Sequence, residues 1–226
     1  MTHRNWFKRY RVVCMGLLAM ASFALSQEGP SSLPLVRALQ RGDLDVAHQI
    51  LRSGVDLNIR DNYGTTALLQ AIRSRSTDFA VELLSAGADA NFAGGGGDTP
   101  LMVAAWHNDL RVARSLLDLK ASVNTANQRG ETALMFAAQT CLDGKMVQFL
   151  LDAGGDPQAK SKDGFTALIW AAGGGNEIAT EKLLRAGSDL HVKNSYGETA
   201  EDLACGRGER GHARVCELLR EASKKN

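Results

Sequence analysis

A glycine followed two residues later by a threonine recurs at a nearly constant interval along this 226-residue chain. The five occurrences are Gly64/Thr66, Gly97/Thr99, Gly130/Thr132, Gly164/Thr166 and Gly197/Thr199. Successive glycines are separated by 33, 33, 34 and 33 residues. Such a period is typical of stacked-repeat proteins, in which one unit cannot bury its apolar face without its neighbours. The interval therefore predicts a solenoid of helical repeats.

Each threonine begins a similar apolar segment. Thr99 is followed by Pro-Leu-Met-Val-Ala-Ala and Thr166 by Ala-Leu-Ile-Trp-Ala-Ala. A threonine hydroxyl can accept a hydrogen bond from an amide of the first helical turn, so we expect each threonine to cap a first helix. The small residues that end the segment allow a second helix and the next repeat to approach closely.

A second helix in each repeat ends on two large aliphatic residues. These pairs are Ile50/Leu51, Leu83/Leu84, Leu116/Leu117, Leu150/Leu151, Leu183/Leu184 and Leu218/Leu219. Apolar residues a turn earlier, such as Phe79/Ala80 and Ile178/Ala179, complete an apolar face at helical spacing. We expect Leu117 and Leu151 to be buried deep in the stack.

Glycine follows most of these second helices and supplies the left-handed residue that ends a helix. The positions are Gly54, Gly87, Gly154 and Gly187. The third repeat has Lys120 there instead, so its turn is expected to be less favourable.

The pattern G-x-T-[PA]-L-x-x-A-A, then two leucines, then G-A-D-x-N resembles the ankyrin repeat, from about Leu35 to Leu219. The resemblance implies an all-α solenoid of six helix-turn-helix units with hairpin-like connecting tips, within a domain spanning residues 27–226. The expected units are 31–63, 64–96, 97–129, 130–163, 164–196 and 197–226. The histidine usual in the family is replaced by Leu69, Met102, Met135, Ile169 and Asp202, which predicts apolar packing between repeats instead of a polar link. The first and sixth units are atypical, as more polar capping repeats are.

The first 26 residues have the order of a secretory signal peptide. Arg4, Lys8, Arg9 and Arg11 precede an uncharged run over 12–25, and small residues then fit a cleavage site near Ser26 or Ala24. The apolar run is shorter than the roughly 20 residues of a membrane-spanning helix. We expect an exported protein that is periplasmic and soluble after cleavage.

Charge excludes two classes of partner. Removal of residues 1–26 leaves 22 basic and 25 acidic residues, a net charge of −3 with the signs interspersed. Such a chain is not expected to bind nucleic acid or an anionic membrane surface. No membrane insertion is expected after cleavage of the signal peptide. We expect a protein partner, and a chain that is monomeric alone.

The chain shows no pattern of catalytic, cofactor-binding or metal-ligating residues. The histidines His48, His107, His191 and His212 lie in different repeats without metal-ligand spacing. The run Gly94–Gly97 lacks the lysine of a phosphate loop. We therefore expect no enzymatic activity, no cofactor and no metal. Cys205 and Cys216 lie in the two helices of the last unit, where they either form a disulfide or act as small buried apolar residues.

What remains is a protein-binding surface. In an ankyrin stack the first helices and the hairpin tips line a concave groove, and the resemblance implies that partner proteins bind there. The candidates on the helices are Trp106, His107, Phe136, Gln139 and Trp170. The candidates at the tips are Arg60, Tyr63, Phe92, Arg129 and Tyr196. Sequence leaves two functions open: an interaction scaffold, or an inhibitor or immunity-type protein that blocks an enzyme or toxin in the periplasm.

Overall fold

The computed structural model describes residues 34–140, 143–206 and 210–224. These belong to one unit, Leu33–Asn226. The expected signal peptide and its cleavage site lie outside the described residues.

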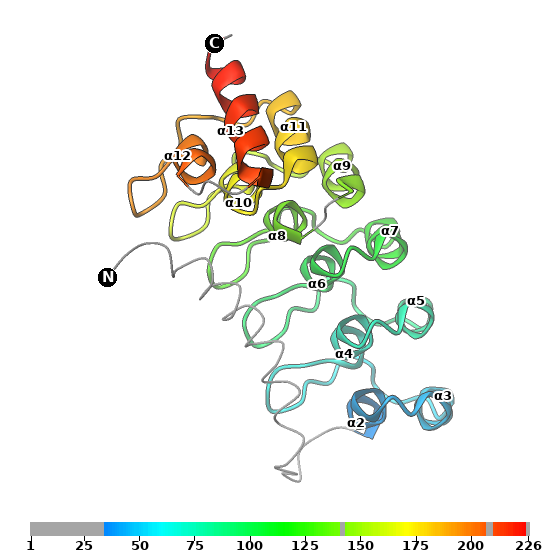
Figure 1. Ribbon diagram of the computed structural model, residues 1–226. Coiled ribbons are helices and arrows are strands. Elements are labelled where there is room, and N and C mark those ends of the chain that lie inside the picture. Colours follow the sequence, from blue (N-terminus) through cyan, green and yellow to red (C-terminus); the bar gives the residue numbers. More distant parts are fainter. Residues whose placement is uncertain (1–33, 141–142, 207–209, 225–226) are drawn as a thin grey trace. The chain divides into compact units, whose positions relative to one another are not determined.

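Six antiparallel helix pairs follow one another along this unit, and the described residues contain no strand (Figure 1). The first helices of the pairs form an inner layer: α2 (Pro34–Arg41), α4 (Ala67–Arg73), α6 (Pro100–Trp106), α8 (Ala133–Thr140), α10 (Ala167–Gly173) and α12 (Ala200–Cys205). The second helices form an outer layer: α3 (Leu44–Arg52), α5 (Thr77–Ser85), α7 (Leu110–Asp118), α9 (Lys145–Asp152), α11 (Glu177–Arg185) and α13 (Arg210–Ser223). We call the pairs units one to six. The expected all-α solenoid is confirmed.

Inner helices pack against their neighbours from α2 to α12. An extended loop joins each outer helix to the next inner helix and projects away from the outer layer (Figure 1). We call this loop the finger. The face of the inner helices that continues into the fingers is called the finger-side face.

Threonine capping is confirmed at four of the five repeats. The hydroxyls of Thr66, Thr99, Thr166 and Thr199 accept bonds from the amides three residues later. The expectation is wrong at Thr132, whose Oγ1 is buried without a hydrogen-bond partner among the described residues. There the amide of Met135 donates to the carbonyl oxygen of Thr132 at 3.1 Å, so the backbone takes the place of the hydroxyl.

The outer helices end as expected. The glycines at 54, 87, 154 and 187 have φ angles of +76°, +96°, +86° and +80°. Lys120 adopts the same left-handed conformation, with φ +63°. Its amide donates to Leu117 O and that of Ala121 to Leu116 O, both at 2.9 Å. The third repeat therefore keeps the turn at a steric cost that glycine avoids.

The apolar positions that replace the family histidine are buried. Leu69, Met102, Met135 and Ile169 are between 0% and 2% exposed, which confirms apolar packing between repeats. The expected deep burial of Leu117 and Leu151 was wrong. Leu116 and Leu150 are fully buried whereas Leu117 and Leu151 are half-buried, because the first leucine of each pair points to the inner layer.

Unit five differs by one residue from the expected register. Ile178 is 43% exposed, whereas Ala179 and Thr180 are fully buried. Thr180 fits this interior because its hydroxyl donates to the carbonyl oxygen of Asn176 at 2.8 Å. The buried pair of α11 is therefore Ala179/Thr180.

Candidate protein-binding surface

The first, third and last fingers are each held by an Asp or Asn side chain at the base, a position that Gly94 occupies in the second finger. Asp61 Oδ1 accepts the amides of Tyr63 and Thr65, at 2.9 and 2.7 Å. Asn127 Oδ1 does the same two units later for Arg129 and Glu131, at 2.9 Å each. Asn194 repeats the arrangement in the last finger. These residues were not singled out from sequence, although an Asp or Asn three positions before the glycine was the available signal.

Neighbouring fingers are also joined to one another. A side-chain oxygen of one finger accepts an amide of the next, at 2.8 to 3.1 Å, and the four pairs are Asn58/Asp89, Asn91/Ser122, Asn124/Asp156 and Gln158/Asp189. Because these bonds recur at each step, they hold the fingers in a regular row. The fingers of the finger-side face are therefore hydrogen-bonded to one another rather than independent loops.

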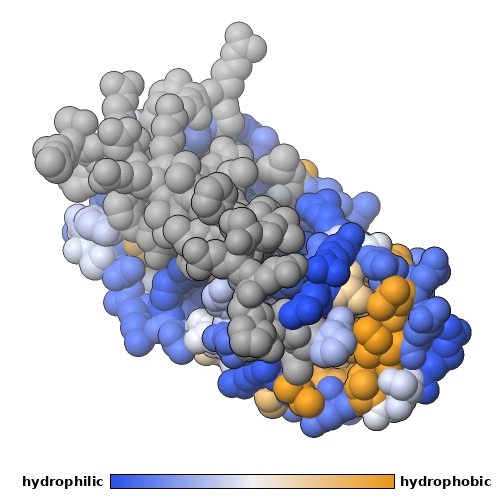
Figure 2. All heavy atoms as spheres, turned by 90° about the horizontal axis from the view of Figure 1, so that it is seen from below, coloured by the Kyte–Doolittle hydropathy of each residue, from blue (hydrophilic) through white to orange (hydrophobic). Residues whose placement is uncertain are grey.

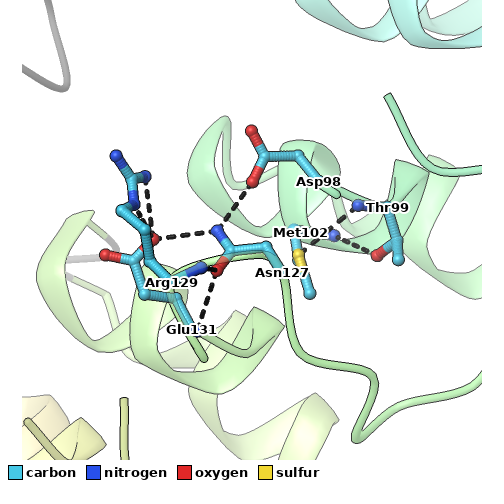
Figure 3. Close-up of polar contacts among 6 residues, drawn as sticks. All are labelled: Asp98, Thr99, Met102, Asn127, Arg129 and Glu131. Carbon is cyan, nitrogen blue, oxygen red and sulfur yellow. Dashed lines mark hydrogen bonds and ion pairs between the residues drawn. The ribbon is translucent and has the colours of Figure 1, made fainter. Parts of the chain in front are cut away.

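A buried polar network connects the third and fourth repeats (Figure 3). Asn127 Nδ2 donates to Asp98 Oδ1 at 2.8 Å and to Glu131 Oε2 at 2.9 Å. Arg129 Nε donates to the same Glu131 oxygen at 2.8 Å. Glu131 is 3% exposed, and a buried carboxylate is stable only when it is paired in this way. The network fixes the base of the finger that leads into α8.

An aromatic row runs along the finger-side face beside this network. The rings of Trp106 and Phe136 meet edge to face with 6.0 Å between centroids. Phe136 and Trp170 line one small pocket, together with Glu131, Met135 and Gln139. The ring of Phe165 lies 5.0 Å from that of Trp170 and 6.5 Å from that of Tyr196. We call Trp106, Phe136, Trp170, Phe165 and Tyr196 the aromatic row.

A comparison with protein families agrees with this architecture. The model described as "Ankyrin repeats (3 copies)" matches residues 35–127, 80–161, 108–194 and 134–226, which overlap and together span residues 35–226. The chain belongs to the ankyrin-repeat family. Ankyrin repeats generally mediate protein–protein interactions.

The ankyrin stack brings several of the candidate residues together, but they differ in how exposed they are. Trp106, Phe136 and Gln139 are half-buried and accessible. Trp170 is only 3% exposed, so its assignment as a surface anchor was wrong. Its indole lies against the ring of Phe165, which fills the space between the finger and α10. Trp170 therefore lines the pocket, and the accessible rings of Trp106 and Phe136 lie beside it.

His107 stands at the end of α6, directly after Trp106. Its imidazole is half-buried, and its Nε2 has no hydrogen-bond partner among the described residues. Burial lowers the pKa of His107, and the nearby positive charges of Arg75 and Arg73 lower it further against the opposing effect of Asp109. The residue thus favours its neutral form at the edge of the aromatic row.

The tip candidates are distributed along the ankyrin stack. The guanidinium of Arg60 lies over the ring of Phe92, with 4.1 Å between its carbon and the centroid, and so joins the first two fingers. Tyr63 is 70% exposed in the first finger. Tyr196 is 45% exposed and contacts the aromatic row, and Arg129 belongs to the buried network. Only the last two therefore adjoin the row.

Three further features of the described residues bear on the chemistry of the chain. No group of three or more His, Cys, Asp or Glu side chains among them is placed to hold a metal ion. None of the helices described in the chain has the length and hydropathy needed to cross a bilayer. Cys205 and Cys216 are joined by a disulfide between α12 and α13, with 5.0 Å between their Cα atoms.

Proposed function

We propose that this ankyrin protein is an exported, non-enzymatic scaffold that binds a partner protein through its finger-side face. The observation that supports this proposal most is the aromatic row. It extends from unit three to the last finger, and three of its members, Trp106, Phe136 and Tyr196, retain accessible surface. Aromatic side chains dominate the energetics of protein interfaces because each buries a large area with little loss of conformational entropy.

The framework around the row suits this function. The adjoining finger is held by charge-assisted hydrogen bonds among Asn127, Arg129 and Glu131. Hydrogen bonds from the amides of one finger to side-chain oxygens of the preceding finger fix the fingers relative to one another. A preorganised surface loses less entropy when a partner binds. Phe136 borders a shallow hollow with Gln139 and Glu131 that is too small to admit a side chain, so we expect an apolar partner side chain to pack over the Phe136 ring rather than enter the hollow.

Two observations support export. The first 26 residues have the charge and hydropathy order of a signal peptide. The Cys205–Cys216 disulfide favours an oxidising compartment, because cytosolic thiols are kept reduced. For a bacterial host this compartment is the periplasm.

Affinity capture from a periplasmic extract tests the proposal. Wild-type protein is compared with Phe136→Ala and with Phe149→Ala. Phe149 is a suitable control because it is also a half-buried aromatic, but it lies on the outer helix α9. We expect one partner that is retained by wild type and Phe149→Ala and lost with Phe136→Ala.

Equal capture by all three proteins would contradict binding at the finger-side face. If the captured partner is a toxin or an enzyme that this protein silences, the inhibitor function is supported in place of the scaffold. An activity assay of the partner with and without the ankyrin protein separates the two.

A further inference from the structure

Among the described residues, the first unit of the ankyrin stack has an exposed apolar face. Val46 of α3 is 40% exposed, whereas its counterparts one and two repeats later, Phe79 and Val112, are 2% and 0% exposed. Phe79 is covered by the preceding unit, since its ring meets that of His48 with 4.9 Å between centroids. No described residue covers Val46 in the same way.

The apolar surface continues from α3 into the first finger. Val55 and Ile59 are 37% and 43% exposed. With Ile50 and Leu57 they line a hollow of about 110 Å³. Figure 2 looks onto this end of the stack and shows the apolar side chains gathered in one patch. We call Val46, Ile50, Val55 and Ile59 the end patch. Contiguous apolar surface of this kind marks an interaction site.

The opposite end of the stack is charged. Exposed residues of α13 form ion pairs with the two helices beside it, Arg214 with Glu177 of α11 at 3.2 Å and Arg220 with Glu201 of α12 at 3.4 Å. Such a surface does not match the end patch, so the two ends are poor partners for head-to-tail stacking. An interface that uses the end patch on both sides is instead twofold symmetric.

Charges on α3 are arranged for this symmetry. Asp45 lies in the first turn of α3 and Arg52 in the last turn, seven residues apart and therefore on the same side of the helix. Both are exposed, and neither makes an ion pair with a described residue. When two copies of α3 pack antiparallel, Asp45 of one copy faces Arg52 of the other, and the reverse pair forms as well.

We propose that the end patch joins two copies of this chain into a symmetric dimer, with α3 packed antiparallel on α3 of the second copy. Val46 and Ile50 form the apolar centre, and the two Asp45–Arg52 pairs flank it. This replaces the monomer expected from sequence. The aromatic row begins in unit three, so dimerisation through unit one leaves the finger-side face of both copies open.

Sedimentation equilibrium of the purified full chain tests the dimer. We expect a concentration-dependent shift to twice the mass of one chain. Val46→Glu should abolish the shift, because it places a carboxylate at the apolar centre of the interface. Ile178→Glu is the matched control: Ile178 is 43% exposed on α11, away from the end patch, and its replacement should leave the dimer intact.

Swapping the charges at positions 45 and 52 tests whether a second copy of the chain binds the end patch. Arg52→Asp replaces two attractive pairs by two repulsive ones and should raise the dimer Kd by roughly tenfold. The double variant Asp45→Arg/Arg52→Asp restores both pairs and should return the Kd to near the wild-type value. The proposal is overturned if the wild type is monomeric at every concentration, if Val46→Glu has no effect on mass, or if the double variant dimerises no better than Arg52→Asp.

Discussion

The ring of Trp106 meets that of Phe136 edge to face, with centroids 6.0 Å apart and an interplanar angle of 84°. The contact joins α6 to α8 and makes Trp106 both a packing residue and a surface residue. The sequence analysis had named Trp106 only as a candidate for the binding surface. Because the two rings touch and form one continuous surface, a partner that contacts either ring is expected to contact both.

Burial of the paired leucines predicts unequal effects within one repeat. Leu116→Ala should lower the free energy of unfolding by about 2–5 kcal/mol, because Leu116 is fully buried and leaves a cavity. Leu117→Ala should cost clearly less, since Leu117 is half-buried. Urea titration of both variants measures the difference. A larger loss for Leu117→Ala would contradict the register of the outer helices described above.

The left-handed backbone at Lys120 predicts a stabilising substitution. Lys120→Gly should raise the free energy of unfolding by about 1 kcal/mol, because glycine adopts φ +63° without the steric cost of a Cβ atom. Lys120→Ala is the control, since it removes the charged side chain but keeps the Cβ atom, and it should give no such gain. Equal effects of the two variants in thermal unfolding would argue against backbone strain as the cause.

The Cys205–Cys216 disulfide predicts a local dependence on redox conditions. It closes a short loop, with a sequence separation of 11, and its reduction should destabilise unit six by about 3 kcal/mol. Hydrogen exchange should then accelerate in α12 and α13 on addition of a reductant. Exchange in α6 and α8 should remain unchanged, because repeat stability depends mainly on nearest neighbours. Unchanged protection of the last unit would show that the disulfide contributes no stability.

The lowered pKa of His107 predicts a loss of stability in mild acid. Its ordinary value is 6.5, and burial followed by the charges of Arg75 and Arg73 holds the pKa below that in the folded state. As the pH falls below about 6.5, the unfolded chain therefore binds a proton that the folded chain resists, and the free energy of unfolding decreases.

Urea titrations at several pH values between neutral and acidic measure this slope. His107→Gln should flatten it over the window just below pH 6.5, because glutamine does not titrate there. The lowered pKa values of the Asp143 and Asp202 carboxylates act only in stronger acid, below their ordinary value of 3.8. An identical slope in wild type and His107→Gln would contradict the role of His107.

Sequence was sufficient for the architecture because one unit repeats and errors in one copy are corrected by the others. The threonine caps, the left-handed glycines and the apolar replacements at Met102 and Ile169 all follow from local chemistry. The burial of a residue that depends on its neighbours along the stack was not predictable in this way. The depth of Trp170 depends on Phe165 in the preceding finger, and the exposure of Val46 depends on what lies beyond unit one.

The hydrogen-bond network around Asn127 could not be predicted from local sequence patterns either. Asn127 bonds both Asp98 and Glu131 because two successive fingers approach each other, a contact that spacing along the chain does not encode. The binding surface therefore stays a prediction, while the division of its residues into accessible rings and buried supports required the packed structure.

Calorimetry with the purified partner tests the central claim most directly. Trp106→Ala should raise the Kd by roughly thirty-fold or more, since a central aromatic anchor contributes about 2 kcal/mol. The variant should lose only about 1 kcal/mol of stability, from the ring contact with Phe136. Phe149→Ala, on the outer layer, should bind as wild type does. Unaltered affinity of a folded Trp106→Ala protein would contradict partner binding at the finger-side face.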